Sequence, residues 1–391
     1  MRTTAASLVA RHGSAASRIL VRARTLREYG VVRALSHKAV ARRFYGAARN
    51  FSDDEYAAIW RDAAGELGAH VVDRQEGFLE IVGEQSSAWV WHQYTTLDDV
   101  LAFRRSLDKQ VVHTVLAAAG LPVPAHAPFR ASDLAPALAF LKSRRGSYVV
   151  KPADGTGGGM GVTAGVRSAE DLVLATAMAS RFGERLLIEE QAAGAMYRLL
   201  FLEGKLLDVV RRASAHVVGD GRSSVRELIA AENRRRLASR RGASFGLLRV
   251  DLDCLLTLRA SGRSMKSIPL AGAKVPLKVS CSDNRREDNE TVRTRLDSRL
   301  VAQAAQAADR LGLRLAGVDI VSLDPHLPLE ANGGVIIEVN CTPGLAHHYH
   351  VRERPTRVAV PVLARLLAPT SLADATFAPP VAVSSCRAID E

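Results

Sequence analysis

The sequence predicts a mixed α+β and α/β fold divided into two or three lobes. Its 391 residues are enough for several hydrophobic cores of ordinary size. Short apolar strands alternate with amphipathic helices, and a glycine-rich loop joins two such strands within residues 147–162. Two later apolar strands carry polar residues in their middle, where burial is costly unless these residues have partners or a function.

The N-terminal part is predicted to begin with a basic helical region and to continue into a small α/β lobe. Residues 1–50 are basic and helical in pattern, and Ser52-Asp53-Asp54-Glu55 is a typical helix start for a helix that ends near Gly68. Residues 70–94 have the pattern of short strands with polar breaks. Helical spacing covers 98–120, which we predict to be one helix.

The remaining chain alternates strands and helices that its hydrophobic periodicity defines. We expect strands at 185–190 and 317–323, and a strand within 334–344 that is followed by a Cys-Thr-Pro-Gly turn. We also expect a hairpin over 197–212 that turns at Glu203-Gly204, helices at 168–182, 223–241 and 291–312, mixed structure over 247–280, and a poorly ordered tail at 369–391.

Charge and cysteine content exclude several classes of function. The net charge is +12, but only eight of the 53 basic residues are lysine, and the arginine runs lack interleaved aromatic residues, so we expect no nucleic-acid partner. No apolar run reaches the roughly 20 residues of a membrane span. Cys254, Cys281, Cys341 and Cys386 have no metal-binding spacing and are predicted to be free thiols. We therefore expect a cytoplasmic protein with no membrane association, and the role of its arginine-rich N-terminus stays open.

The glycine-rich loop predicts an anion-binding site. Five of the seven residues from Gly155 to Gly161 are glycine, and such a loop can bring backbone N–H groups close to anionic oxygens. Lys151 ends the preceding strand, where its ammonium can act as a phosphate clamp. The loop is neither a P-loop nor a GxGxxG turn. A flexible hairpin is the alternative interpretation.

Carboxylates at strand ends and strand centres are the other candidate site residues. Glu189 and Glu190 end a strand and could read an adenine edge, or they could be a solvated strand end. Asp319 lies 19 residues before Glu338, a spacing that fits adjacent antiparallel strands, and Asn340 shares the face of Glu338. Three hard oxygen donors suit Mg²⁺. Buried polar residues with ordinary partners are the alternative.

The order and spacing of these candidate site residues resemble the pattern found in the ATP-grasp ligases. The resemblance rests on Lys109, Lys151, the glycine loop, Glu189, Asp319 and the Glu338-x-Asn340 pair, and it covers residues 70–365. The stretches "RRASAHVVGDGRSSVRELIAAENRRR" and "EVNCTPGLAHHYH" are similar to the ATP-grasp module of cyanophycin synthetase and of bifunctional glutathione-synthesising enzymes.

The resemblance implies an ATP-grasp fold with an N-terminal α/β lobe, a small lid lobe and a C-terminal mixed α+β lobe. The implied boundaries are 1–107 for the basic region and first lobe, 108–190 for the lid lobe, 191–368 for the metal-binding lobe and 369–391 for the tail. ATP would lie between the last two lobes. The implied activity is formation of an amide between amino acids or short peptides through an acyl phosphate, in a specialised biosynthetic pathway.

The resemblance also assigns roles to residues. ATP would be bound by Lys109, Lys151, Gly157, Gly158, Gly159, Glu189 and Glu190, and Mg²⁺, with Mn²⁺ as the alternative ion, by Asp319, Glu338 and Asn340. Arg212, Lys278 and Arg198 would be catalytic, facing the γ-phosphate, the acyl phosphate or the substrate carboxylate.

Two departures from the family pattern leave alternatives open. Met196 occupies a position where the relatives carry an acid that contacts ribose, and "KVSCSDNRREDNETV" lacks the glycine pair of their substrate loop. The alternatives are a protein that phosphorylates a carboxylate without forming an amide, and a non-catalytic nucleotide- or polyanion-binding module. The expected partners are amino-acid or peptide carboxylate and amine substrates, and a homo-oligomer remains open.

Overall fold

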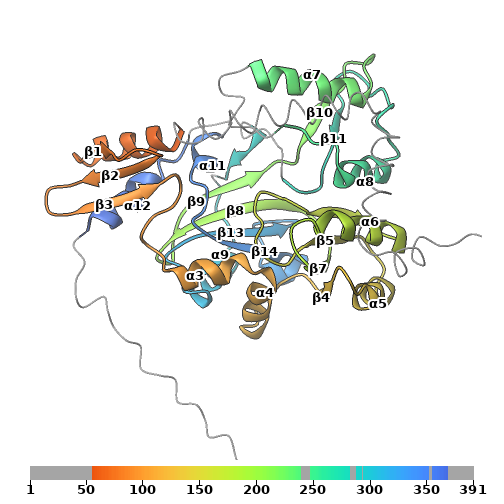
Figure 1. Cartoon of the computed structure of the whole chain (residues 1–391), viewed down its shortest axis with the longest axis horizontal. Helices are drawn as coiled ribbons and strands as arrows, with labels where there is room; N and C mark the ends of the chain where they lie inside the picture. Colours follow the sequence, from red (N-terminus) through yellow and green to blue (C-terminus); the bar gives the residue numbers. More distant parts are fainter. Residues whose placement is uncertain (1–54, 239–246, 282–287, 293, 352–354, 369–391) are drawn as a thin grey trace, which may run out of the picture.

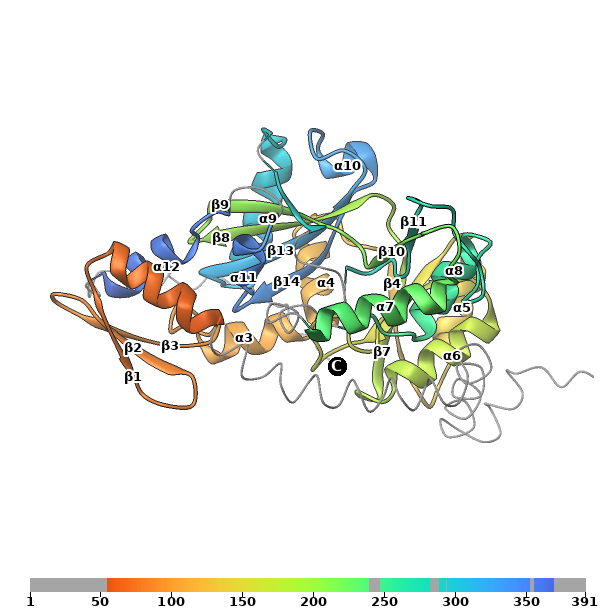
Figure 2. The same ribbon diagram turned by 90° about the horizontal axis from the view of Figure 1, so that it is seen from above.

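A computed structural model describes residues 55–238, 247–281, 288–292, 294–351 and 355–368. The basic region 1–50, the helix-start residues before Glu55 and the tail 369–391 lie outside the described residues. The N-terminal α/β lobe lies at one end of the molecule and a four-stranded sheet at the other, with a five-stranded sheet between them (Figures 1 and 2).

The N-terminal lobe is an antiparallel three-stranded sheet covered by helices from both ends of the chain. A helix over residues 55–66 and α12 (Ala359–Leu367) pack on the face where every second strand residue is apolar. Trp60 is fully buried in this core. The short strands predicted within residues 70–94 are confirmed; they are β1 (His70–Asp73), β2 (Phe78–Val82) and β3 (Ser87–Trp91).

The four-stranded sheet carries the glycine loop between two of its antiparallel strands. Its strand order is β4-β7-β5-β6, and the loop joins β5 to β6. Helix α6 starts where Ser168 accepts a hydrogen bond from Asp171 N, so the predicted helix is confirmed, but it starts one residue later and ends three residues earlier than expected. Its elements are β4 (His126–Arg130), α5 (Ala135–Ser143), β5 (Tyr148–Pro152), β6 (Thr163–Val166), α6 (Ala169–Ala179) and β7 (Arg185–Glu190).

The five-stranded sheet has the order β12-β9-β8-β13-β14 and is packed on one face by α9. The predicted hairpin is confirmed: β8 and β9 turn at Glu203-Gly204, where both residues have positive φ. Its elements are β8 (Ala195–Leu202), β9 (Lys205–Arg212), β12 (Glu290–Thr291), α9 (Ser298–Arg310), β13 (Leu315–Ser322) and β14 (Val335–Cys341).

A smaller unit covers the cleft between the two large sheets. It has its own apolar core and contacts the four-stranded sheet where α8 packs on β6. Its elements are β10 (His216–Val218), α7 (Val225–Ala238), α8 (Leu252–Ala260) and β11 (Lys274–Pro276). Two one-turn helices, α10 (Leu329–Asn332) and α11 (Ala346–Tyr349), flank β14 in the chain.

Two predicted helices were wrong in extent, and capping explains both. Residues 98–120 form two helices, α3 (Val100–Leu107) and α4 (Lys109–Ala118), because Asp108 interrupts the first helix and caps the second. The predicted helix over 291–312 begins only at Ser298, since Asp297 is its N-cap and Thr291 pairs with Val210 in the sheet.

The predicted lobe boundaries at residues 107, 190 and 368 stay predictions. Apolar residues of α4 belong to the core of the five-stranded sheet, although the helix lies within the predicted lid range. Its first turn also contacts the four-stranded sheet, because Lys109 N donates to Ala153 O at 2.8 Å. Helix α4 therefore connects the two sheets that border the cleft.

Candidate functional site

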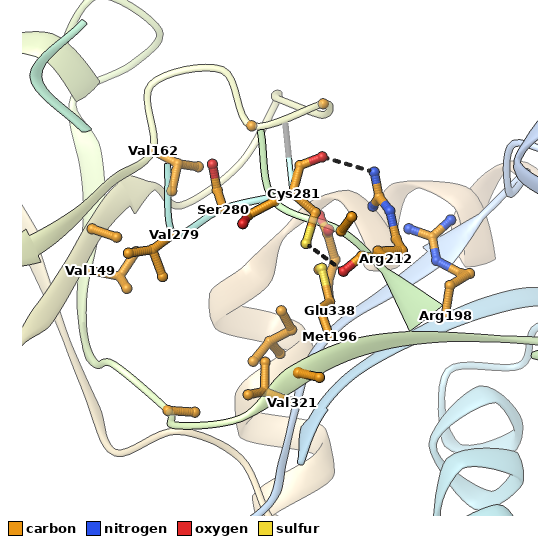
Figure 3. Close-up of a pocket in the computed structure, with 18 of the residues that line it drawn as sticks. Val149, Val162, Met196, Arg198, Arg212, Val279, Ser280, Cys281, Val321 and Glu338 are labelled. Atoms are coloured by element: carbon orange, nitrogen blue, oxygen red, sulfur yellow. Dashed lines mark hydrogen bonds between the residues drawn. The ribbon is translucent and has the colours of Figure 1, made fainter. Parts of the chain in front are cut away.

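A cavity of about 960 Å³ lies between the two large sheets and the smaller unit. All the predicted site residues line it except Lys278 and Asp319. One part of its wall is apolar, formed by Val149, Val162, Val279, Val321 and Met196, and the other part is polar (Figure 3). This division suits a ligand with an apolar ring at one end and charged groups at the other.

The glycine loop forms one edge of the cavity, and its backbone needs glycine. Gly158 and Gly159 have φ of 60° and 73°, in the left-handed region that L side chains rarely adopt. Gly161 also passes close to other atoms: a Cβ there would lie 2.7 Å from the Phe182 ring and 2.8 Å from Pro152 Cγ. Gly157 to Gly159 line the cavity, as expected for a loop whose N–H groups bind anionic oxygens.

Lys109 connects the glycine loop to β14. The residue begins α4 and is 6% exposed, and its Nζ donates to Thr156 O at 3.1 Å and lies 3.8 Å from Glu338 Oε1. Burial lowers the pKa of the Lys109 ammonium, and the Glu338 carboxylate opposes that shift. The predicted phosphate ligand is thus held at the junction of the loop and the predicted metal strand.

Lys151 and Glu189 form a buried ion pair on neighbouring strands of the four-stranded sheet. Lys151 Nζ lies 2.6 Å from Glu189 Oε1, and the two side chains are only 8% and 4% exposed. The predicted contact of Glu189 with adenine stays a prediction, and its carboxylate has a cationic partner in this structure. Glu190, which also lines the cavity, ends the same strand, and Arg144 Nη1 lies 3.1 Å from its Oε2.

The predicted metal strands are neighbours in the predicted orientation. Asp319 on β13 is the direct antiparallel partner of Glu338 on β14, and on its other side it is the partner of Arg198 on β8. Cross-strand partners share a face of the sheet, so the three side chains form one row. The spacing of the two carboxylates in the sequence therefore gave the correct strand pairing.

Within this row, Asp319 is bound by Arg198. Arg198 Nη2 donates to Asp319 Oδ2 at 2.6 Å, and Arg198 Nε donates to the other carboxylate oxygen. Asp319 is completely buried and does not line the cavity. Gly317 makes room for this pair, because a Cβ there would lie 3.1 Å from Arg198 Cδ and 2.8 Å from Pro343 Cβ.

Glu338 and Asn340 fit a magnesium ion better than the full predicted set does. Both line the cavity, and Asn340 Nδ2 donates to Gly317 O at 3.2 Å, which leaves the amide oxygen for a ligand. Mg²⁺ commonly takes one or two protein oxygens together with substrate phosphates. Within the described ranges, no group of three or more His, Cys, Asp or Glu side chains could hold a metal ion, so substrate oxygens would have to complete the coordination.

Lys278 is not among the residues that line the cavity, and its predicted position facing a phosphate stays a prediction. Its Nζ lies 2.6 Å from Asp251 Oδ2 and the side chain is 3% exposed. Asp253 is nearby; burial, and then the charge of Asp251, raises its pKa to about 7. Asp253 accepts hydrogen bonds from Ser280 Oγ and Ala164 N, so the cluster joins two walls of the cavity.

Arg212 lines the polar part of the cavity, and its predicted catalytic role stays a prediction. It lies at the end of β9, beside Arg198 of β8, and its Nη2 donates to Cys281 O at 3.4 Å (Figure 3). Burial raises the pKa of the Cys281 thiol to about 11, so at neutral pH this cysteine is a neutral wall residue. Val279, Ser280 and Cys281 also line the cavity; they lie in the stretch that corresponds to the relatives' substrate loop, although no periodic pattern marked them individually.

Among the described residues, no helix has the length and apolar character needed to cross a bilayer. Cys254, Cys281 and Cys341 are free thiols, as predicted, and Cys386 lies outside the described residues.

The sequence and the structure of this chain are both similar to those of known proteins. Cyanophycin synthetase from a Nostoc species is 31% identical over 256 residues, which cover 64% of this chain and 28% of that protein. The glutathione biosynthesis bifunctional protein GshAB of Streptococcus mutans is 29% identical over 313 residues, covering 77% and 41%. The solved structure of a bifunctional glutathione synthetase from Pasteurella multocida matches with a TM-score of 0.50 and 26% identity, covering 76% and 42%. No protein-family model matches the chain.

The sheets of the structure, the site between them and these similarities show that the chain has the ATP-grasp fold. It is similar to the ATP-grasp parts of cyanophycin synthetase and of the bifunctional glutathione enzymes. The chain spans less than half the length of either curated relative.

Proposed function

We propose that this protein is an ATP- and Mg²⁺-dependent carboxylate–amine ligase that joins amino acids or short peptides. The observation that carries the proposal is the single cavity lined by the glycine loop, Lys109, Lys151, Glu338 and Asn340. A carboxylate oxygen of one substrate would attack the γ-phosphorus of ATP, with ADP leaving. The amine of the second substrate would then attack the acyl carbon, with phosphate leaving as the amide forms.

The residues that line the cavity could bind each part of the nucleotide that this reaction uses. The loop N–H groups and the two lysines would bind and orient the triphosphate, and the apolar wall around Val149 and Val279 would enclose the base. Glu338 and Asn340 would hold Mg²⁺, which supplies charge neutralisation during phosphoryl transfer. Arg212 points into the polar part, where its guanidinium would stabilise negative charge on the transferred phosphoryl group.

An ADP-release screen tests the proposal. The purified chain is given ATP, Mg²⁺ and pools of amino acids and dipeptides, and the products are identified by mass spectrometry. We expect ADP release that requires both a carboxylate and an amine, with a product mass equal to the two substrates minus one water. Absence of ADP release with every pool would contradict the proposal.

A matched pair of variants links that activity to the cavity. Glu338→Gln removes the carboxylate from the cavity, and we expect ADP release to fall about a hundredfold. Glu330→Gln is the control, because Glu330 is an exposed residue of α10 that does not line the cavity. Equal rates in the two variants would show that ADP is released elsewhere.

A nucleotide-binding module without catalysis is the second candidate, and the state of Asp319 favours it. Both of its carboxylate oxygens are bound by Arg198, so only Glu338 and Asn340 of the predicted metal ligands face the cavity. Under this candidate, the chain would bind ATP with an affinity that Mg²⁺ does not change and would release no ADP.

A further inference from the structure

His113 is a completely buried histidine between the two sheets that border the cavity. It lies on α4, four residues after Lys109, so both side chains leave the same face of the helix. Nothing in the sequence singled it out, because a lone histidine within "KQVVHTVLAA" fits an ordinary helix core. Its neighbours in the structure are polar groups of the proposed nucleotide site.

The two ring nitrogens of His113 contact different sheets. His113 Nε2 lies 3.4 Å from Ile337 O on β14, the strand of the five-stranded sheet that carries Glu338. His113 Nδ1 lies 3.4 Å from Glu189 Oε1 on β7 of the four-stranded sheet. The same Glu189 oxygen is 2.6 Å from Lys151 Nζ, so the ring stands between β14 and the Lys151–Glu189 pair.

The His113 ring is neutral, which suits a side chain that keeps β14 and β7 at a fixed distance. Burial lowers the pKa of His113 to about 4; the Glu189 carboxylate opposes this shift, while Lys151 and His126 add to it. The neutral ring has one N–H; Nε2 is within hydrogen-bonding distance of Ile337 O, while Nδ1 lies 3.4 Å from Glu189 Oε1 without forming a hydrogen bond. Its orientation is therefore set largely by packing, including an edge contact with the His126 ring at 4.7 Å between centroids.

Lys109 makes the corresponding connection one helical turn earlier. Its ammonium contacts Thr156 O at the glycine loop and lies near Glu338 Oε1, while His113 contacts the backbone one residue before Glu338. Two side chains of one helix face thus fix β14 relative to the loop and to Lys151. A shift of α4 would change the separation of these groups together.

We propose that His113 is a positioning residue that holds the Lys151 ammonium and the Glu338 carboxylate at the separation that a metal-bound nucleoside triphosphate requires. This inference rests on the proposed function, because it assigns His113 a role in nucleotide binding. His113 acts through Glu189 and the β14 backbone and does not itself touch the nucleotide.

Calorimetric titration with a non-hydrolysable ATP analogue and Mg²⁺ tests this role without requiring turnover. His113→Leu removes both polar contacts, and we expect the affinity to fall about tenfold. His113→Gln can keep one contact and should stay within about threefold of the original protein. His113→Asn is too short to span both neighbours and should behave like the leucine variant. If the leucine variant does not fold, the asparagine and glutamine variants carry the comparison.

Two further measurements separate positioning from general destabilisation. Val112→Ala is the matched structural control, since Val112 is the adjacent core residue of α4; it should lower the free energy of unfolding and leave nucleotide affinity unchanged. In a Lys151→Met background, His113→Leu should cost less than about twofold in affinity, because one of the two groups whose separation His113 sets is gone. An additive loss in the double variant would overturn the proposal.

The outcomes also distinguish this inference from the proposed function. If the unsubstituted chain binds no nucleotide, the proposed function fails and the role of His113 fails with it. If the unsubstituted chain binds nucleotide but His113→Leu and His113→Asn bind it equally well, only the positioning role is overturned.

Discussion

Two buried ion pairs lie at the cavity, one in each large sheet, and they are built differently. Lys151 and Glu189 touch through one ammonium–oxygen contact, and both residues line the cavity. Arg198 and Asp319 are joined by two hydrogen bonds, and Asp319 is completely buried behind the cavity wall. An ammonium with three donors can keep its partner and still bind a ligand, whereas the arginine–carboxylate fork uses both oxygens of its acceptor.

This difference indicates that charged residues at one site can have separate tasks. The lysine pair presents a cation to the cavity, while the arginine pair joins the neighbouring strands β8 and β13 of the five-stranded sheet, beside the strand that carries Glu338.

Asp319→Ala should destabilise the fold more than any other change considered. It leaves the Arg198 guanidinium buried without its carboxylate, which costs about 3–5 kcal/mol when one partner of a buried pair is removed. Urea unfolding measures the loss. Glu290→Ala is the control, because its pair with Arg211 is exposed and should be worth less than about 1 kcal/mol. Similar losses in both variants would mean that the Arg198–Asp319 pair does not support the sheet.

Lys151→Met should act mainly on ligand binding. Removal of a charged donor from the cavity should weaken binding of an ATP analogue about a hundredfold, as measured by calorimetry. Lys205→Met is the control, since Lys205 is exposed on β9 and does not line the cavity. If both variants bind equally, the lysine pair does not present its cation to the nucleotide.

Gly317→Ala should have the smallest of the three effects. The added methyl would press on Arg198 and Pro343, and overpacking of this kind costs about 1–2 kcal/mol in unfolding free energy. Gly157→Ala is the comparison for stability, because no atom lies within 4 Å of a Cβ at that position; it should change stability by less than about 0.5 kcal/mol. An unchanged stability for Gly317→Ala would show that Arg198 is not tightly packed there.

Local patterns in the sequence predicted much of this site. Period-2 alternation and the spacing of Asp319 and Glu338 predicted the antiparallel pair β13–β14, and the glycine run predicted the loop beside Lys151. These features depend on residues close together in the chain, so the sequence displays them directly.

Partners from distant segments could not be predicted in the same way. Arg198 is 121 residues from Asp319, and the register of β8 against β13 decides that they meet. Lys278 pairs with Asp251, which is 27 residues away in the chain, and no motif lies between them. No local pattern therefore indicated that Lys278 would contact Asp251 and not the cavity. The break between α3 and α4 was visible in principle, because Asp108 is a typical N-cap, but helical periodicity continues across it.

A structure of the chain with Mg²⁺ and a non-hydrolysable ATP analogue tests the central claim most directly. We expect the triphosphate within hydrogen-bonding distance of the backbone N–H groups at 157–159 and of the Lys109 and Lys151 ammonium groups, with a metal ion bound by Glu338 and Asn340. A nucleotide bound outside this cavity, or inside it without contact to either lysine and without a metal on Glu338, would contradict the account.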